Sequence, residues 1–341
     1  MKHIIEANPA LPPHLPQVKT VIVDEDSAGQ RLDNFLMRHL KGVPKTHVYR
    51  IIRSGEVRVN KGRASADDRV AMGDLVRLPP VRISERVAEK AEAMAQSMAR
   101  GAPARDFIIL FEDEHLLAID KPSGVAVHGG SGVSFGVIEQ LRMARPQARF
   151  LELVHRLDRE TSGILLVAKK RSALTNLQDQ FRERETGKTY LALVSGRWPG
   201  NKKVLDKPLH KYLLPDGERR VKVVSKEDPD GMPSMTLVKV RPTGATAFTL
   251  LEVTIKTGRT HQIRVHLASE GFPIVGDDKY GDFELNKTLV RPGKLPALKR
   301  MFLHAWRLQF NHPASGERVE LLAQLPLELE TFSTHAAPSL A

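Results

Sequence analysis

The chain contains no cysteine among its 341 residues. This absence excludes a disulfide framework, a thiolate site for zinc or an iron–sulfur cluster, and a cysteine nucleophile. Any catalysis by this protein must therefore use oxygen or nitrogen groups.

Long apolar runs are also missing. No stretch approaches the roughly 18 uncharged apolar residues that indicate a membrane span. The N-terminal segment, MKHIIEANPALPPHLPQ, has no apolar core of the length found in signal peptides. We therefore expect a cytoplasmic protein without a membrane partner.

The charge is unbalanced toward basic residues. Lys and Arg number 52 against 40 Asp and Glu, which gives a formal net charge of +12. A surplus of this size indicates an anionic partner, most often nucleic acid. Half of the surplus lies in residues 29–80, which hold 11 Lys and Arg but 5 Asp and Glu.

The length predicts about two domains, and composition divides the chain into five segments. Residues 1–20 carry four prolines without hydrophobic periodicity, which is typical of a disordered leader. Residues 21–81 form a basic block, and residues 82–105 have the Ala, Glu and Arg content of a linker. We expect a larger second domain over residues 106–327 and a frayed tail over residues 328–341.

The pattern of the basic block predicts two short helices followed by strands. The first helix has its apolar stripe at Leu32, Phe35, Leu36 and Leu40. The second helix begins at Pro44, ends before Gly55 and has its stripe at Val48, Ile51 and Ile52. Alternating valines at 57 and 59, a turn at 60–62 and an apolar run at 75–78 predict the strands.

Both predicted helices place their basic residues opposite the apolar stripe. Solvation is the common explanation for a basic helix face, but the basic density of this block is well above the chain average. The order of its elements, with QRLDNFL and IIRSGEVRVNKGR, resembles the S4 RNA-binding domain. The residues that we expect to contact RNA here are Arg31, Arg38, Lys45, Arg50, Arg53, Arg58 and Lys61.

The second domain mixes apolar runs of strand length with helical patterns. The runs lie at 108–111, 116–119, 164–167, 190–194 and 248–253, and the helical patterns at 135–144 and 172–184. Strands this numerous, joined by both turns and helices, predict an α+β fold with a mixed, largely antiparallel sheet.

Three cofactor motifs fail on spacing. The TGKT at 186–189 lacks the earlier glycine of a P-loop, because position 182 is Arg. The HGGSG at 128–132 lacks the glycine register of a dinucleotide site. His261 and His266 stand five apart on a segment that reads as extended, and no Cys or nearby carboxylate completes a metal set. We expect neither a metal nor a nucleotide cofactor.

The segment LVHRLDRETSGILLV at 153–167 is the most informative in the chain. Asp158 follows Arg156 and precedes Arg159 in a loop that leads into an apolar strand. Neighbouring cations favour the ionised carboxylate, which suits a nucleophile or a charge stabiliser better than a proton donor. From these residues alone, a salt-bridged structural loop is the alternative.

This segment closely resembles the active-site motif H-R-L-D-x-x-T-S-G of the RluA-type pseudouridine synthases. Two further stretches, KTYLALV at 188–194 and TGRTHQIRVH at 257–266, resemble motifs of the same family in the expected order. KPSG at 121–124 and GDDKYG at 276–281 are similar too. The resemblance covers residues 25 to about 325, and it includes the S4-like block.

The resemblance implies an isomerase that converts uridine to pseudouridine without a cofactor. Asp158 is then the catalytic residue, acting by attack at C1′, by attack at C6 or through a glycal. Tyr190 stacks on the uracil and serves as, or positions, a base; an ordinary core tyrosine is the alternative. Arg264 pairs with the Asp158 carboxylate, unless it contacts a phosphate. Arg156 helps to displace the target base.

Three more residues, Lys121, His128 and Asp277, lie in family-like loops that either line the cleft or only shape it. Within the family, the chain is most similar to members that modify large-subunit (23S) ribosomal RNA, which we expect as the partner of a monomeric enzyme. The alternatives are the same chemistry on transfer RNA or on another ribosomal site, and a non-catalytic, ribosome-associated RNA-binding protein of the S4 type.

Overall fold

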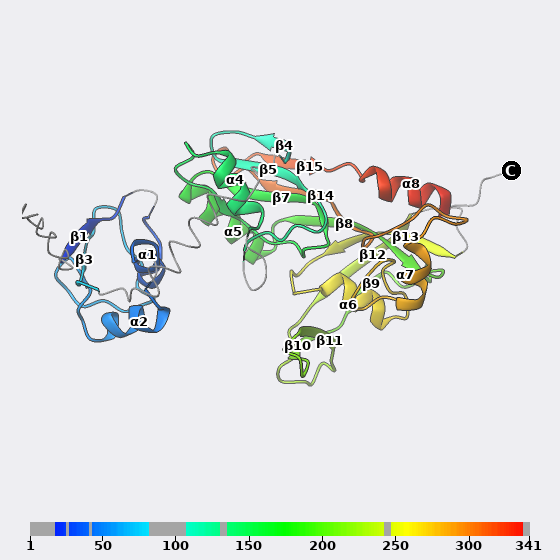
Figure 1. Ribbon diagram of the computed structural model, residues 1–341, viewed down its shortest axis with the longest axis horizontal. Helices are drawn as coiled ribbons and strands as arrows, with labels where there is room; N and C mark the ends of the chain where they lie inside the picture. The colour runs from blue at the N-terminus through cyan, green and yellow to red at the C-terminus, as the bar shows by residue number, and fades with distance from the viewer. Residues whose placement is uncertain are drawn as a thin grey trace, which may run out of the picture. The chain divides into compact units, whose positions relative to one another are not determined.

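The computed structural model describes residues 18–24, 27–40, 43–81, 107–129, 135–241 and 247–336 (Figure 1). The chain divides into two compact units, residues 1–102 and 103–341, and each is described by itself. The predicted linker lies outside the described residues, as does the predicted leader up to residue 17. Within the described ranges, no helix combines the length and the apolar character needed to cross a membrane.

The first unit packs two helices on a three-stranded antiparallel sheet. Its elements are β1 (Lys19–Ile22), α1 (Leu32–His39), α2 (Lys45–Arg53), β2 (Arg58–Val59) and β3 (Leu75–Leu78), in the strand order β1-β3-β2. The predicted apolar stripes of both helices are buried, apart from the half-buried Leu40. The predicted leader extends too far, because Lys19 and Thr20 already pair with Leu78 and Arg77 in the sheet.

The second unit is built on one mixed sheet of ten strands. The order is β4-β5-β7-β14-β8-β13-β12-β9, with β6 beside β7 and β15 beside β14. The strands are β4 (Ile108–Glu112), β5 (Leu116–Lys121), β6 (Glu152–Leu153), β7 (Ser162–Ala168), β8 (Gly187–Ser195), β9 (Val204–Asp206), β12 (Met235–Arg241), β13 (Phe248–Ile255), β14 (Leu303–Asn311) and β15 (Arg318–Leu322). Among these, β7 and β14 run parallel and the other pairings are antiparallel. The predicted fold class is confirmed.

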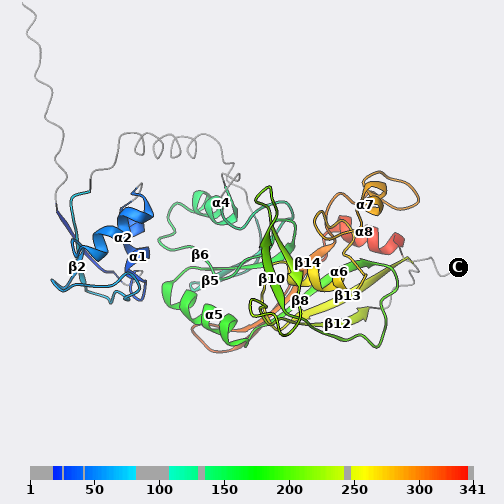
Figure 2. The ribbon, with the colours of Figure 1, turned by 90° about the horizontal axis from the view of Figure 1, so that it is seen from below.

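Two helices cover opposite faces of β5 and β7 (Figure 2). Helix α5 (Arg171–Glu183) packs on the face that carries Ile164 and Leu166, and α4 (Val137–Ala144) packs on the face that carries Leu165 and Val167. Every residue of β7 is buried, because successive side chains of a strand point to opposite faces and both faces are covered here.

The other half of the sheet carries helices α6 (Gln262–Ser269), α7 (Phe283–Leu289) and α8 (Leu327–Ala336). The predicted frayed tail is wrong for residues 328–336, which belong to α8. Leu329 and Phe332 are fully buried, and the Phe332 ring lies 6.0 Å from the Phe248 ring of β13. Two apolar anchors in one helical turn are too few to produce a clear periodic pattern, yet they hold the helix on the core.

A two-stranded hairpin that the sequence pattern did not predict extends from the sheet in Figure 1. It consists of β10 (Leu209–Leu213) and β11 (Arg219–Val223), which pair antiparallel. Its strands are rich in polar and basic residues and largely exposed, so they lack the apolar alternation of a half-buried strand.

Candidate active site

Four residues predicted from three separate motifs line one pocket of the second unit: Arg156, Asp158, Tyr190 and Arg264. Asp158 and Arg264 stand 106 positions apart in the sequence. The sheet order brings Asp158 near Tyr190, because a single strand, β14, lies between β7, which follows Asp158, and β8, which carries Tyr190. The other lining residues are Leu157, Thr161, Ile255, Gly258, Arg259, Thr260, His261, Gln262, Ile263 and Leu303.

The loop that carries Asp158 is held from below by the KPSG turn. The Lys121 ammonium, fully buried, donates to the carbonyls of Pro122, Val125 and Arg159 at 2.8, 2.9 and 3.0 Å. The amide of Gly124 also donates to the Arg159 carbonyl at 2.9 Å. Burial lowers the pKa of Lys121 to about 7. Lys121 does not line the pocket; it supports the loop from inside the domain.

The strand that follows this loop is fixed against β14. Ser162 accepts a hydrogen bond from Arg300 Nη2 at 2.7 Å, and its hydroxyl lies 2.8 Å from Nδ1 of the buried His304. Gly163 has a φ of 109°, and a Cβ at this position would lie 2.3 Å from the Ala305 carbonyl oxygen. Only glycine permits such an approach, so the Thr-Ser-Gly of the motif joins β7 closely to β14.

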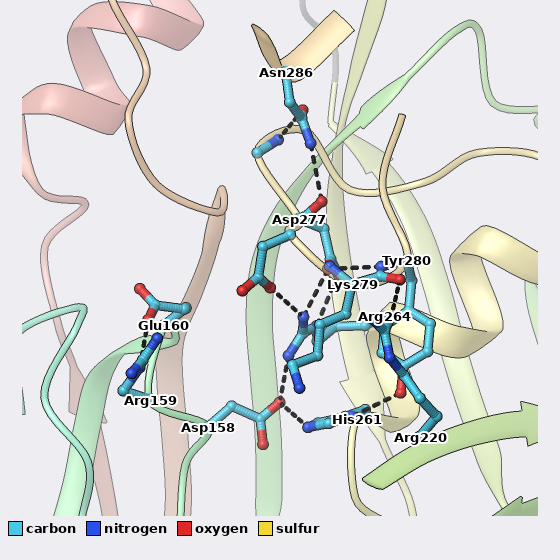
Figure 3. Close-up of polar contacts among 12 residues, drawn as sticks. Asp158, Arg159, Glu160, Arg220, His261, Arg264, Asp277, Lys279, Tyr280 and Asn286 are labelled. Carbon is cyan, nitrogen blue, oxygen red and sulfur yellow. Dashed lines mark hydrogen bonds and ion pairs between the residues drawn. The ribbon is translucent and has the colours of Figure 1, made fainter. Parts of the chain in front are cut away.

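The Asp158 carboxylate is partly exposed and turns its Oδ2 toward two groups of the α6 region (Figure 3). Oδ2 lies 3.5 Å from Arg264 Nη1 and 3.9 Å from His261 Nε2. The cation beside Asp158 is therefore Arg264. Arg159, which the sequence places next to Asp158, instead pairs with Glu160 at 2.7 Å.

Arg264 is itself held by a second carboxylate. Its Nε and Nη2 donate to the two oxygens of Asp277 at 2.7 and 2.6 Å, and Nη2 also reaches Asp278 at 3.1 Å. Asp277 is fully buried and Arg264 nearly so. Burial opposes the charge of Arg264, but the hydrogen bonds and charge of Asp277 outweigh it and raise the arginine pKa.

Asp277 is anchored by the loop in which it lies. Its Oδ1 accepts the amides of Lys279 at 2.8 Å and Tyr280 at 3.0 Å, and its own carbonyl accepts from Asn286 at 2.9 Å. Burial works against ionisation of Asp277, but the bonds from Arg264 and the two amides hold its pKa below the usual value. Asp277 thus positions Arg264 and does not line the pocket.

Tyr190 reaches the pocket from β8, half-buried between two apolar clusters of the domain. Burial raises the pKa of its phenol, and the neighbouring Asp158 carboxylate raises it further. The phenol therefore keeps its proton at neutral pH. This state suits a ring that stacks or a hydroxyl that donates better than it suits a phenolate base.

His261 and Tyr280 belong to the site but were not predicted as site residues. The segment that carries His261 and His266, predicted as extended, is helical: Gln262–Ser269 form α6, and His261 is its N-cap. Residues 262–267 are all buried, so this helix shows no amphipathic period. The available signal was the position of His261, three residues before Arg264 in one motif.

The histidines considered as metal ligands have protein partners instead. His266 is fully buried, with Nδ1 2.9 Å from the Thr236 hydroxyl and Nε2 2.9 Å from the Lys207 carbonyl. Elsewhere in the described residues, His210, Asp228 and Asp230 bring three ligand atoms within 4.8 Å, but none of them lines the pocket and Asp230 is exposed. His128, on the glycine-rich loop, does not line the pocket either.

The basic residues predicted to contact RNA lie on the surface of the first unit. Arg31, Arg38, Lys45, Arg50, Arg53 and Lys61 are exposed, and Arg58 is half-buried. Arg58 and Lys61 line a hollow with Arg77, and Arg53 lines another with Tyr49 and Arg63. Two of the predicted residues are ion-paired, Arg31 with Asp33 at 2.9 Å and Arg50 with Glu56 at 3.2 Å.

Comparison with known proteins identifies the families to which the two units are similar. The family described as RNA pseudouridylate synthase matches residues 115–269, and the S4 domain matches residues 30–76. Ribosomal large subunit pseudouridine synthase C of Escherichia coli strain K12 is 53% identical over 310 residues, which cover 91% of this chain and 94% of that protein. The chain belongs to the RluA-type RNA pseudouridine synthases.

A second bacterial relative bears the same name as the Escherichia coli protein. The one from Salmonella typhi is 52% identical over 315 residues, with 92% of this chain and 95% of that protein covered. Among solved structures, human RNA Pseudouridylate Synthase Domain Containing 4 matches 73% of the synthase and 97% of its own length, at 26% identity and a TM-score of 0.54. Asp158, Tyr190 and Arg264 all fall within the range that the family matches, whereas Asp277 and Tyr280 lie beyond it.

Proposed function

We propose that this synthase isomerises specific uridines of large-subunit (23S) ribosomal RNA to pseudouridine, with Asp158 as the residue that acts on the nucleotide. The pocket in which Asp158, Arg264 and Tyr190 meet is the observation that carries the proposal. The large-subunit substrate is supported by the relatives named for it, which match nearly the whole chain.

The reaction is an isomerisation, so substrate and product contain the same atoms. The bond between N1 and C1′ breaks, C5 bonds to C1′, the C5 proton leaves and N1 gains a proton. Because nothing is added or oxidised, the residues of the pocket can carry the reaction without a cofactor.

Asp158 supplies the carboxylate that acts on the ribose or the uracil. Both of its contacts use Oδ2, which faces Arg264 and His261. Oδ1 is then the oxygen directed at the nucleotide. Attack at C1′, attack at C6 and elimination to a glycal all use the carboxylate oxygen, and the buried Arg264 cation lies 3.5 Å from Oδ2 on the other side.

Arg156 and Tyr190 act on the uracil base of the target nucleotide: Arg156 displaces it and Tyr190 stacks on it. A uridine in folded RNA must leave its stack before it can react, at a cost of a few kcal/mol. Arg156 is exposed at the pocket and lies two residues before Asp158, where it can take the place of the displaced base. The Tyr190 ring offers a surface on which the extruded uracil stacks.

The S4 domain supplies contacts to the RNA backbone. Phosphate contacts from its exposed Arg and Lys residues add affinity that is salt-dependent and largely independent of sequence. Arg38, Lys45, Arg53, Arg58 and Lys61 are the main candidates, because Arg31 and Arg50 already pair with carboxylates.

The enzyme works as a monomer in the cytoplasm, where its substrate is made.

The test maps pseudouridines in 23S ribosomal RNA from a strain that lacks this gene. Wild-type protein restores the missing sites, and Asp158→Asn, which keeps the shape but not the charge, does not. Tritium release from C5-labelled ribosomal RNA by the purified protein gives the same answer in vitro. Restoration by Asp158→Asn contradicts the role of Asp158. If the strain loses pseudouridine from transfer RNA alone, transfer RNA is the substrate. If wild-type protein binds RNA but releases no tritium, the protein is not a pseudouridine synthase.

A further inference from the structure

A chain of contacts leads from the β10–β11 hairpin to the Asp158 carboxylate (Figure 3). The Val221 amide donates to the Tyr280 hydroxyl at 3.0 Å. That hydroxyl lies 2.8 Å from Nδ1 of His261, and His261 Nε2 lies 3.9 Å from Asp158 Oδ2. His261 is thus the group between Tyr280 and Asp158.

These contacts favour one tautomer of His261. The Tyr280 oxygen accepts the Val221 proton, so its own single proton is available to His261 Nδ1. A neutral imidazole has one N–H and one acceptor nitrogen. When Nδ1 accepts, Nε2 carries the proton, and this N–H faces Asp158.

The surroundings keep His261 neutral. Burial lowers its pKa, and the Arg264 and Lys279 cations lower it further, whereas the Asp158 and Asp277 carboxylates oppose them. The remaining group against the ring is Tyr280, at 5.5 Å between ring centres. A neutral donor can orient a carboxylate without taking its charge.

The backbone at His261 is also unusual. Its φ of 54° and ψ of 20° lie in the left-handed region, which costs a residue other than glycine roughly 1–2 kcal/mol. Such strain concentrates at functional sites, where the surrounding structure enforces it. Here it starts helix α6 and points the imidazole into the pocket that Asp158 lines.

We propose that His261 is a positioning residue for Asp158, whose Nε2–H binds Oδ2 of the carboxylate while Tyr280 holds the tautomer. The inference rests on the proposed role of Asp158. The distance of 3.9 Å is longer than a hydrogen bond, and contacts of this kind shorten when the substrate closes the site. With Arg264 and His261 both on Oδ2, rotation of the carboxylate is restrained, and Oδ1 stays directed at the nucleotide.

The experiment measures single-turnover tritium release from C5-labelled 23S ribosomal RNA with enzyme in excess. His261→Ala should slow release on the order of a hundredfold, which is the effect of a misplaced reacting group, while the Kd for RNA stays unchanged. His261→Asn should behave alike, since Asn tolerates the left-handed backbone but is too short to reach Asp158. His335→Ala on α8, an exposed histidine bonded within its own helix, should match wild type.

A double mutant separates positioning from support of the fold. Tyr280→Phe should slow release roughly tenfold, because its ring contacts with Arg264 and Arg220 remain while the hydroxyl is lost. In the His261→Ala background, Tyr280→Phe should add nothing, because it acts through the histidine.

Two results overturn the inference. One is a wild-type rate of tritium release in the folded His261 variants. The other is a double mutant whose loss of rate equals the product of the losses in His261→Ala and Tyr280→Phe. Asp158→Asn is measured alongside. If Asp158→Asn also keeps its rate, the proposed function itself has failed; if Asp158→Asn is inactive, the failure concerns His261 alone.

Discussion

Arg264 and Asp277 form a two-pronged ion pair inside the second unit, with N–O distances of 2.7 and 2.6 Å. The same guanidinium turns its remaining nitrogen, Nη1, toward Asp158 at 3.5 Å. The orientation of the group beside Asp158 is therefore determined by a carboxylate that never reaches the pocket. This arrangement separates Asp158, the proposed catalytic residue, from Asp277, the residue that fixes the orientation of Arg264.

Replacing Asp277 should lower the free energy of unfolding far more than replacing its neighbour Asp278. Asp277→Asn leaves the buried Arg264 charge poorly compensated, and we expect a loss of about 3 kcal/mol in the free energy of unfolding. Asp278→Asn, at an exposed position, should cost less than about 1 kcal/mol. Urea unfolding of the two variants tests this. Equal losses would show that Arg264 depends on both carboxylates alike.

Lys121 should make stability depend on pH. Its pKa in the folded protein, about 7, lies below the ordinary value of 10.5, so between these values the unfolded chain binds more protons. Stability from this group then increases as pH rises above 7, by up to about 1.4 kcal/mol per pH unit. Relative to Lys121→Met, wild type should gain roughly 2 kcal/mol between pH 7 and pH 9 in urea unfolding. A constant difference would mean that the amine stays charged throughout.

Tyr190 should contribute mainly through its ring to binding and through its hydroxyl to rate. Stacking on an aromatic ring is worth about 1–3 kcal/mol per base. Tyr190→Phe should therefore keep the Kd for substrate RNA while slowing tritium release, and Tyr190→Ala should also weaken binding about tenfold. Because the pKa of Tyr190 is raised, the wild-type rate should show no effect of tyrosine ionisation between pH 7 and pH 9. A step in the rate near pH 8 would contradict this.

The S4 domain should account for part of the salt dependence of binding. Arg58→Gln combined with Lys61→Gln removes two cations that line one hollow. The slope of log K against log salt should fall by roughly 1.4 to 1.8, if each side chain contacts one phosphate. Arg50→Gln is the matched control, because Arg50 already pairs with Glu56. Filter binding across a salt series measures all three, and an unchanged slope in the double variant would exclude this hollow as a phosphate site.

The sequence predicted those parts of the molecule whose signal is local. The helices of the first unit, the strands around Asp158 and the helices α4 and α5 each have an apolar pattern that their burial requires, and each lies within a few residues of its predicted position. The loop of Asp158 was predicted as a candidate site because its residues form one continuous motif.

The missed features depend on contacts distant in sequence or on surroundings that remove the pattern. The Asp277 pairing with Arg264 spans 13 positions and follows from no helical or strand period. Helix α6 is buried on all sides, so it lacks the polar face by which a helix is recognised. The β10–β11 hairpin was missed for the opposite reason: its strands are largely exposed and have almost no apolar face.

The parallel pairing of β7 with β14 has a consequence for the order in which the protein folds during its synthesis. Ser162 and its partner His304 are 142 positions apart, so the strand after Asp158 gains its neighbour only when most of the chain has left the ribosome. The S4 domain closes its own sheet within the first 78 residues of the chain and can fold as soon as it emerges. A newly made chain can therefore hold RNA before it is able to modify it.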